Sequence, residues 1–140
     1  MYNQCIQEGE RHYAHVGVLS MLERNKQIKA RPQRFQEADS AYLRDIDFVF
    51  CLESRVFADV VDDLMCQRHP SADMRPIHVF NLETEDSSDG AKTGASWMVR
   101  FAQVLEEEVG HDLTTEIASE LLEEFEAESG LQLMYCLCYL

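Results

Sequence analysis

The chain has 140 residues, of which 46% are hydrophobic, so it is long enough for one domain with its own core and is not a disordered tail. It has no apolar run of the roughly 18 residues that a membrane span needs, and its first residues lack the pattern of a signal peptide. The net charge of −14 is uneven: residues 1–80 carry 12 acids and 10 bases, whereas residues 81–140 carry 14 acids and 2 bases. The acidic second half predicts no binding to nucleic acid or to an anionic membrane. Five cysteines without an export signal indicate free thiols in a reducing compartment.

The N-terminal part, residues 1 to about 26, has a helical pattern, and Gly17 divides it into two predicted helices. A basic segment, residues 24–34, follows with five bases and no acid. A solvated basic loop is the commoner origin of such a segment, and attraction of a phosphorylated ligand is the functional alternative.

The middle of the chain predicts a short apolar strand over residues 47–52 and then a helix over residues 53–67. The apolar stripe expected on this helix consists of Phe57, Val60, Val61, Leu64 and Met65, with Asp59, Asp62 and Asp63 on the opposite side. A second apolar run, residues 76–82, is typical of a strand that is covered on both faces.

An acidic loop follows this second strand, with carboxylates at Glu83, Glu85, Asp86 and Asp89. Ligands of open α/β sheets bind at the carboxyl ends of the strands, so a carboxylate in this loop is a candidate general acid. A solvated turn is the commoner interpretation of the loop taken by itself.

The last third of the chain predicts two helices and a final strand over residues 131–139. The first helix places Ala91, Ala95, Met98, Ala102, Leu105 and Val109 on one side. The second is capped by Thr114 or Thr115 and ends at Gly130. The alternation of helices and strands predicts an α/β fold, a parallel three-layer sandwich with about three strands and helices on both faces.

Short motifs add little chemistry on their own. Residues 5–11 match the Cys-x5-Arg loop of cysteine-dependent phosphatases, but no strand precedes Cys5, and Glu8 and Glu10 would repel a phosphate dianion. Cys136 and Cys138 share one strand face and are expected to be core thiols, because a zinc site needs about four ligands. His78 is expected to be a hydrogen-bonded core histidine. The sequence thus predicts no metal site and no cofactor.

The chain as a whole resembles the RNA polymerase II C-terminal-domain phosphatases that remove phosphate from serine in the heptad repeat, which have a fold similar to low-molecular-weight tyrosine phosphatases. The resembling segments run nearly from end to end: residues 21–36, 48–64, 76–86 with Gly94 and Ala95, and 120–130 with the final strand. The resemblance implies a cysteine-dependent protein serine/threonine phosphatase of the nucleus, acting in transcription and mRNA 3′-end processing. The implied partners are the phosphorylated C-terminal domain of the polymerase and a symplekin-like cleavage and polyadenylation scaffold, without direct contact to nucleic acid or membrane.

The resemblance also implies site residues. The family's general acid is an aspartate in the loop after the strand 76–82, and by residue order it corresponds to Asp86, with Glu83 as the alternative. It would protonate the leaving serine oxygen and then activate the water that hydrolyses the phosphocysteine. The basic segment falls in a family block, which makes Arg24 and Lys26 weaker candidates for binding the phosphopeptide.

The chain departs from the family pattern at its start. In the family, a strand leading into Cys-x5-Arg-Ser precedes the region that resembles Met1 onward, and the difference is roughly 60 residues, about a βαβ unit with its loops. Residues 1–140 are therefore expected to form one domain that corresponds to the C-terminal two-thirds of a phosphatase, truncated to three strands and inactive alone.

Three hypotheses remain open from the sequence. The first is a phosphatase of which the 140 residues are a part. The second is a non-catalytic short form that binds the scaffold. The third is an active site rebuilt around Cys5.

Overall fold

The computed structural model describes residues 17–69, 72–109 and 112–140, and these fall into two compact units that divide between Glu37 and Ala38. The first unit contains α2 (Val18–Ile28) and a short 3-10 turn, η1 (Phe35–Glu37). Gly17 precedes α2 with a φ of 75°, a left-handed conformation that suits glycine. The predicted helix before Gly17 lies outside the described residues.

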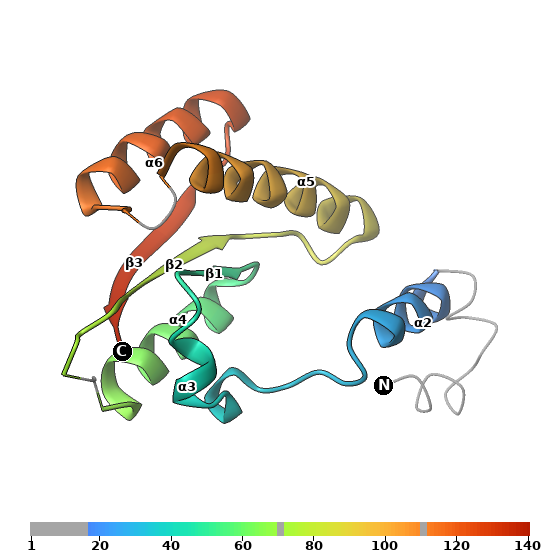
Figure 1. The fold of residues 1–140 in the computed structure, drawn as a ribbon. Coiled ribbons are helices and arrows are strands. Elements are labelled where there is room, and N and C mark those ends of the chain that lie inside the picture. Colours follow the sequence, from blue (N-terminus) through green and yellow to red (C-terminus); the bar gives the residue numbers. More distant parts are fainter. Residues whose placement is uncertain (1–16, 70–71, 110–111) are drawn as a thin grey trace. The chain divides into compact units, whose positions relative to one another are not determined.

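The second unit is built on a sheet of three strands in the order β1 (Phe48–Cys51), β2 (Pro76–Leu82) and β3 (Leu133–Tyr139) (Figure 1). β1 is parallel to β2, and Phe48 pairs with His78. β2 is the central strand, and six of its seven residues are buried. This confirms the α/β class, the three strands and the doubly covered central strand.

The third strand corrects the prediction of a parallel sheet. β3 is antiparallel to β2, and its first residue, Leu133, pairs with Leu82, the last residue of β2. The reason is the number of helices between them, because α5 (Ser88–Val104) and α6 (Thr115–Ser129) form two successive passes. One helix would return the chain to the start of β2, whereas two bring it back to the end where β2 stopped.

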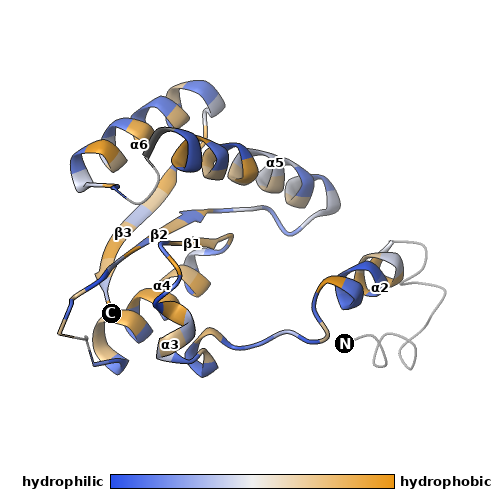
Figure 2. Cartoon of the chain, in the orientation of Figure 1, coloured by the Kyte–Doolittle hydropathy of each residue, from blue (hydrophilic) through white to orange (hydrophobic). Residues whose placement is uncertain are grey.

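The helices of this unit cover both faces of the sheet, as predicted (Figure 1). α3 (Ser40–Leu43), α4 (Ser54–Asp62) and the π-helical turn η2 (Asp63–Gln67) lie on one side. α5, the π-helical turn η3 (Leu105–Val109) and α6 lie on the other. Hydrophobic residues recur between hydrophilic ones along α4 and α6, as expected of helices with one buried face (Figure 2). None of the described helices combines the length and the apolar character needed to cross a membrane.

The core between the sheet and the pair α5–α6 is organised around Phe80. Its side chain is fully buried, and its ring centre lies 5.0 Å from those of Phe101 on α5 and Tyr135 on β3. Phe125 of α6 packs against Phe101 and also against Trp97, at ring separations of 5.4 and 5.7 Å. Aromatic contacts therefore join the two helices to the central strand.

The helix after β1 differs from its predicted pattern near its end. Val60 and Leu64 are buried as expected, but Met65 is 59% exposed and Asp63 is buried. Asp63 lies three residues after Val60 and next to Leu64, so at the ordinary helical period it stands on the border of the buried face, where η2 begins. There its carboxylate accepts a hydrogen bond from Nε of Arg68 at 2.6 Å, and Arg68 also donates to the carbonyl of Ala38 at 2.8 Å.

α5 also buries a different set of residues from the one predicted at its start. Gly94, Met98, Phe101 and Leu105 are buried, whereas Ala91 and Ala95 are exposed. Phe101 carries far more apolar surface than the alanines and is buried in the core, so the face that includes it packs on the sheet, and Gly94 on the same face lies close to Thr84.

Several local predictions are confirmed. Nδ1 of His78 lies 2.8 Å from the hydroxyl of Tyr135, so this buried histidine is hydrogen-bonded within the core. Thr114 caps α6 by accepting from the amide of Ile117, and Gly130 ends it with a φ of 69°. The Sγ atoms of Cys136 and Cys138 lie 3.9 Å apart on one strand face, where Cys138 is buried and Cys136 is half-buried.

The central position of Phe80 predicts a large loss of stability on truncation. Phe80→Ala should lower the free energy of unfolding by about 3–5 kcal/mol, because it removes a buried ring and leaves a cavity. The control is Val99→Ala on the exposed side of α5, which should change it by less than about 0.5 kcal/mol. Chemical denaturation measures both, and equal losses would contradict this account of the core.

Candidate active site

The acidic loop leaves the sheet at the carboxyl ends of the two parallel strands. It joins Leu82, the end of β2, to Ser88, the start of α5. The amide of Thr84 donates to the carbonyl of Leu52, just after β1, at 3.1 Å, and the Thr84 hydroxyl donates to the carbonyl of Leu82 at 3.0 Å. These bonds fix the first part of the loop to both strands, at the edge where open α/β sheets bind ligands.

Glu83 is held by the first turn of α4. Its Oε2 accepts a hydrogen bond from the Ser54 amide at 2.7 Å and another from the Ser54 hydroxyl. The side-chain amide of Asn81 approaches the same oxygen at 3.5 Å. Glu83 thus satisfies an amide at the helix start, where a negative charge is favoured. The hydrogen bonds from the Ser54 hydroxyl and amide lower the pKa of Glu83, so its carboxylate holds a proton poorly.

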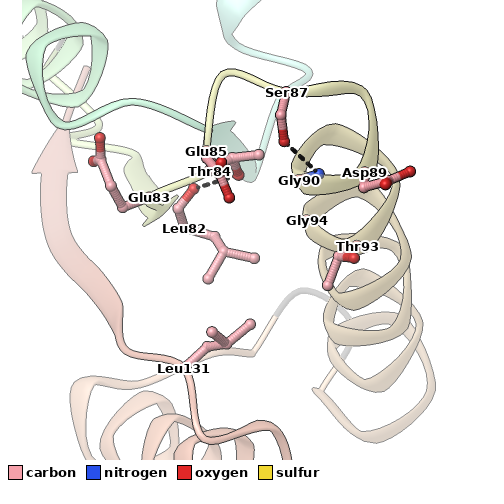
Figure 3. Close-up of a pocket in the computed structure, with 10 residues that line it drawn as sticks. All are labelled: Leu82, Glu83, Thr84, Glu85, Ser87, Asp89, Gly90, Thr93, Gly94 and Leu131. Carbon is pink, nitrogen blue, oxygen red and sulfur yellow. Dashed lines mark hydrogen bonds between the residues drawn. The ribbon is translucent and has the colours of Figure 1, made fainter.

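Two glycines of α5 allow the loop to pack closely on the helix (Figure 3). A Cβ at Gly94 would lie 2.6 Å from Oγ1 and 2.8 Å from Cγ2 of Thr84. A Cβ at Gly90 would lie 2.6 Å from the carbonyl oxygen of Glu85. Glycine is therefore required at both positions by the path of the loop above the helix.

Asp86 lies between the attached residues Glu83 and Thr84 on one side and Ser87, at the start of α5, on the other. The following residue, Ser87, is the N-cap of the helix, and its hydroxyl accepts from the amide of Gly90 at 3.0 Å. Asp86 itself is exposed. The loop therefore presents this carboxylate to solvent from a backbone that is fixed on both sides.

Two hollows flank the acidic loop. The hollow in Figure 3, about 530 Å³, lies towards α5 and is lined by the loop, the start of α5 and Leu131. The other, about 1160 Å³, lies between the loop, the end of β1 and the first turn of α4, and Asp86 lines this one. Its apolar wall is formed by Phe50, Leu52 and Val56.

Two charged residues of the larger hollow, Glu53 and Arg55, were not predicted as site residues. Its carboxylates are Glu53, Glu83, Glu85 and Asp86, and its single base is Arg55. The available signal was a base in the first turn of the helix after β1. This base alone did not indicate a site. The acidic loop, which begins about thirty residues later in the chain, lies against that turn only in the folded protein.

The cysteines that the structure describes do not have the character of an attacking thiolate at this site. Cys51 lines the larger hollow but is 4% exposed, and burial raises the pKa of its thiol. Burial and the neighbouring Cys136 raise the pKa of Cys138 to about 12. Cys66 and Cys136 line neither of the two hollows. Cys5, with its Cys-x5-Arg pattern, lies outside the described residues.

The weaker candidates lie in the first unit. Arg24 and Lys26 belong to α2, none of whose residues is buried. That unit is described by itself, so their part in binding a phosphopeptide stays a prediction.

The whole chain, residues 1–140, matches the model of a family described as Ssu72-like protein. The chain is 34% identical over 139 residues to the SSU72 proteins of Gallus gallus and of Homo sapiens, which are named as phosphatases of the RNA polymerase II C-terminal domain. These matches cover 99% of this chain and 67% of each relative.

Solved structures agree with this match. A crystal structure of D. melanogaster Ssu72 with Symplekin, bound to a cis peptidomimetic phosphoserine peptide of the CTD, superposes with a TM-score of 0.84 at 25% identity. The superposition covers 99% of this chain and 68% of the D. melanogaster Ssu72 chain. A monoclinic crystal form described as the D. melanogaster serine phosphatase of the RNA polymerase II CTD gives a TM-score of 0.82 at 27% identity.

The hydrogen bonds of Glu83 predict a pH-dependent contribution to stability. Because its pKa is lowered on folding, the carboxylate stabilises the fold at pH above the ordinary value of about 4.3, and this contribution is lost as the pH falls below it. Glu83→Gln should therefore lower the melting temperature at pH 7, and the difference from the wild type should shrink towards pH 3. Glu85→Gln, an exposed acid of the same loop, is the control. A difference that is the same at both pH values would contradict the role of the charged carboxylate.

The close approach at Gly94 predicts a clash that a second substitution relieves. Gly94→Ala should lower the free energy of unfolding by about 1–3 kcal/mol, because the added methyl overlaps the Thr84 side chain. This loss would occur although alanine favours helices over glycine by about 1 kcal/mol. Thr84→Ala combined with Gly94→Ala should recover part of the loss, as measured by a double-mutant cycle in denaturant. Strict additivity of the two substitutions would show that the contact is unimportant.

Proposed function

The chain belongs to the Ssu72-like family, and from this premise we propose that it forms part of a protein phosphatase that removes phosphate from serine in the heptad repeats of the RNA polymerase II C-terminal domain. The reaction belongs to transcription and mRNA 3′-end processing in the nucleus. The proposed partners are the phosphorylated C-terminal domain and a symplekin-like cleavage and polyadenylation scaffold. Residues 1–140 would correspond to the C-terminal two-thirds of the phosphatase domain.

Asp86 is the proposed general acid. The observation that carries this choice is the contrast between two carboxylates of one loop, because Glu83 is bound to Ser54 while Asp86 is exposed and lines the larger hollow. A general acid must hold a proton to donate, and the lowered pKa of Glu83 makes it a poor donor. Asp86 has no such engagement with the start of α4 and can approach a substrate in the hollow.

The proposed reaction has two steps. A cysteine thiolate attacks the phosphorus of phosphoserine, the bond from phosphorus to the serine oxygen breaks, and Asp86 gives its proton to that oxygen. In the second step, the Asp86 carboxylate takes a proton from water, which attacks the phosphocysteine and releases inorganic phosphate and the thiolate. Neither step needs a metal or another cofactor.

The attacking thiolate is not assigned to a described cysteine, because burial raises the pKa of both Cys51 and Cys138. We therefore expect residues 1–140 to supply the acid side of the reaction and to need a Cys-x5-Arg-Ser loop for turnover. The same observation supports the second candidate function, a non-catalytic short form that binds the scaffold. The two candidates differ in whether the protein, at the length it has in its own cells, releases phosphate.

The assignment of the general acid predicts the effect of Asp86→Asn. In the protein at its native length, kcat on a phosphoserine heptad peptide should fall about 10²–10⁴-fold, because the amide cannot donate a proton to the leaving oxygen. Glu85→Gln is the matched control from the same loop and should retain most of the activity. Near-normal turnover by the Asp86→Asn protein would move the acid to Glu83 or elsewhere. Loss of activity in a Cys5→Ser protein would instead favour the active site rebuilt around Cys5.

A further inference from the structure

The hollow that Asp86 lines has an unfavourable charge for the proposed substrate. Four carboxylates line it, and a carboxylate is charged at neutral pH. A phosphoserine carries about −1.5 to −2 charges at pH 7, so these carboxylates repel it. A substrate of this charge needs cations that offset the repulsion, in addition to the arginine of the Cys-x5-Arg-Ser loop that the proposed reaction requires.

Arg55 is the single base among the residues that line the hollow. It is the second residue of α4, next to Ser54, which Glu83 binds. Among the other bases of this unit, Arg68 pairs with Asp63, Arg75 with Asp47, Lys92 with Asp89 and Arg100 with Glu128, and neither these nor Arg44 line the hollow. A guanidinium can bind phosphate through two parallel hydrogen bonds, a geometry that lysine lacks.

The position of Arg55 has no evident structural purpose. A base in the first turn of a helix is opposed by the helix dipole, and the side chain is 81% exposed, so it gains little from packing. Its ion pair with Glu53 joins Nε to Oε1 at 3.2 Å on the surface, where such pairs contribute little to stability. A residue that breaks a local rule without a compensating gain is expected at functional sites.

We propose that Arg55 is a specificity-determining residue, whose guanidinium binds the phosphate of the phosphopeptide substrate in the hollow beside Asp86. This inference rests on the proposed function, since it names a contact of the same site. Glu53 competes with the phosphate for the guanidinium, and the exposed ion pair opens when the substrate binds.

The test measures binding, so that it does not depend on turnover. The protein at its native length is titrated against a fluorescent heptad peptide with one phosphoserine and against the same peptide without phosphate. Arg55→Gln should weaken binding of the phosphopeptide about tenfold and leave the unphosphorylated peptide unchanged. Arg44→Gln, which removes an exposed base at the end of α3 outside the hollow, should stay within about twofold of the wild type.

Two further variants separate a specific contact from general charge. Arg55→Lys keeps the charge but loses the planar guanidinium with its two parallel donors, so its affinity for the phosphopeptide should lie between those of the wild type and Arg55→Gln. Glu53→Gln should tighten binding of the phosphopeptide, and this gain should disappear when Arg55→Gln is also present. A gain that persists in the double variant would show that Glu53 acts by general repulsion and would overturn the proposed competition.

The inference fails if Arg55→Gln binds the phosphopeptide as Arg44→Gln does, or if the wild type does not distinguish the two peptides. Phosphate release, measured in parallel, tests the proposed function separately. A wild type that releases no phosphate while Arg55→Gln still weakens binding would overturn the reaction and leave the Arg55 contact standing. A wild type that releases phosphate with Arg55→Gln unimpaired would overturn the contact alone.

Discussion

Burial of β2 on both faces is the constraint on which the second unit depends. The strand pairs with β1 on one edge and with β3 on the other, and helices cover its two sides. Phe80 meets the aromatic residues of α5 and β3 on one face, while α4 packs against the other. Because the strand is held in this way, the point at which it ends is fixed, and the acidic loop begins there.

The site follows from how the loop is attached after that point. Glu83 bonds to the start of α4, and Thr84 fits against Gly94 of α5, so the loop bridges the helices of the two faces. These attachments use one carboxylate for structure and leave another, Asp86, exposed above a hollow. The same bond brings the first turn of α4, and with it Arg55, to the acidic loop. The bond between Glu83 and Ser54 therefore holds the loop in place and also brings Arg55 close to Asp86.

Local sequence patterns predicted the strand bounds and helix ends, which depend on residues close together in the chain. The bounds of β2 and the ends of α6 at Thr114 and Gly130 were foreseen, because runs of apolar residues and capping residues act over a few positions. The two helices before β3 were predicted, but the inference of a parallel sheet overlooked that two successive helices return the chain to the end at which β2 stops. The burial of Asp63 was missed because its position on the border of the apolar stripe was overlooked: it lies three residues after Val60 and next to Leu64. At the site, residue order and resemblance selected Asp86 and Glu83 as candidates for the general acid. Only the hydrogen bonds from Ser54 to Glu83 distinguish the two carboxylates. Arg55 could not be foreseen, because it comes next to the loop only through long-range folding.

Phosphate release by the protein at the length it has in its own cells is the most direct test of the account. The protein is isolated from those cells, its intact mass is recorded, and it is incubated with a phosphoserine heptad peptide. The account predicts release of inorganic phosphate, together with a Cys-x5-Arg-Ser peptide in the digest. Binding of the phosphopeptide without any release would contradict the proposed reaction and would direct the search for function to the scaffold.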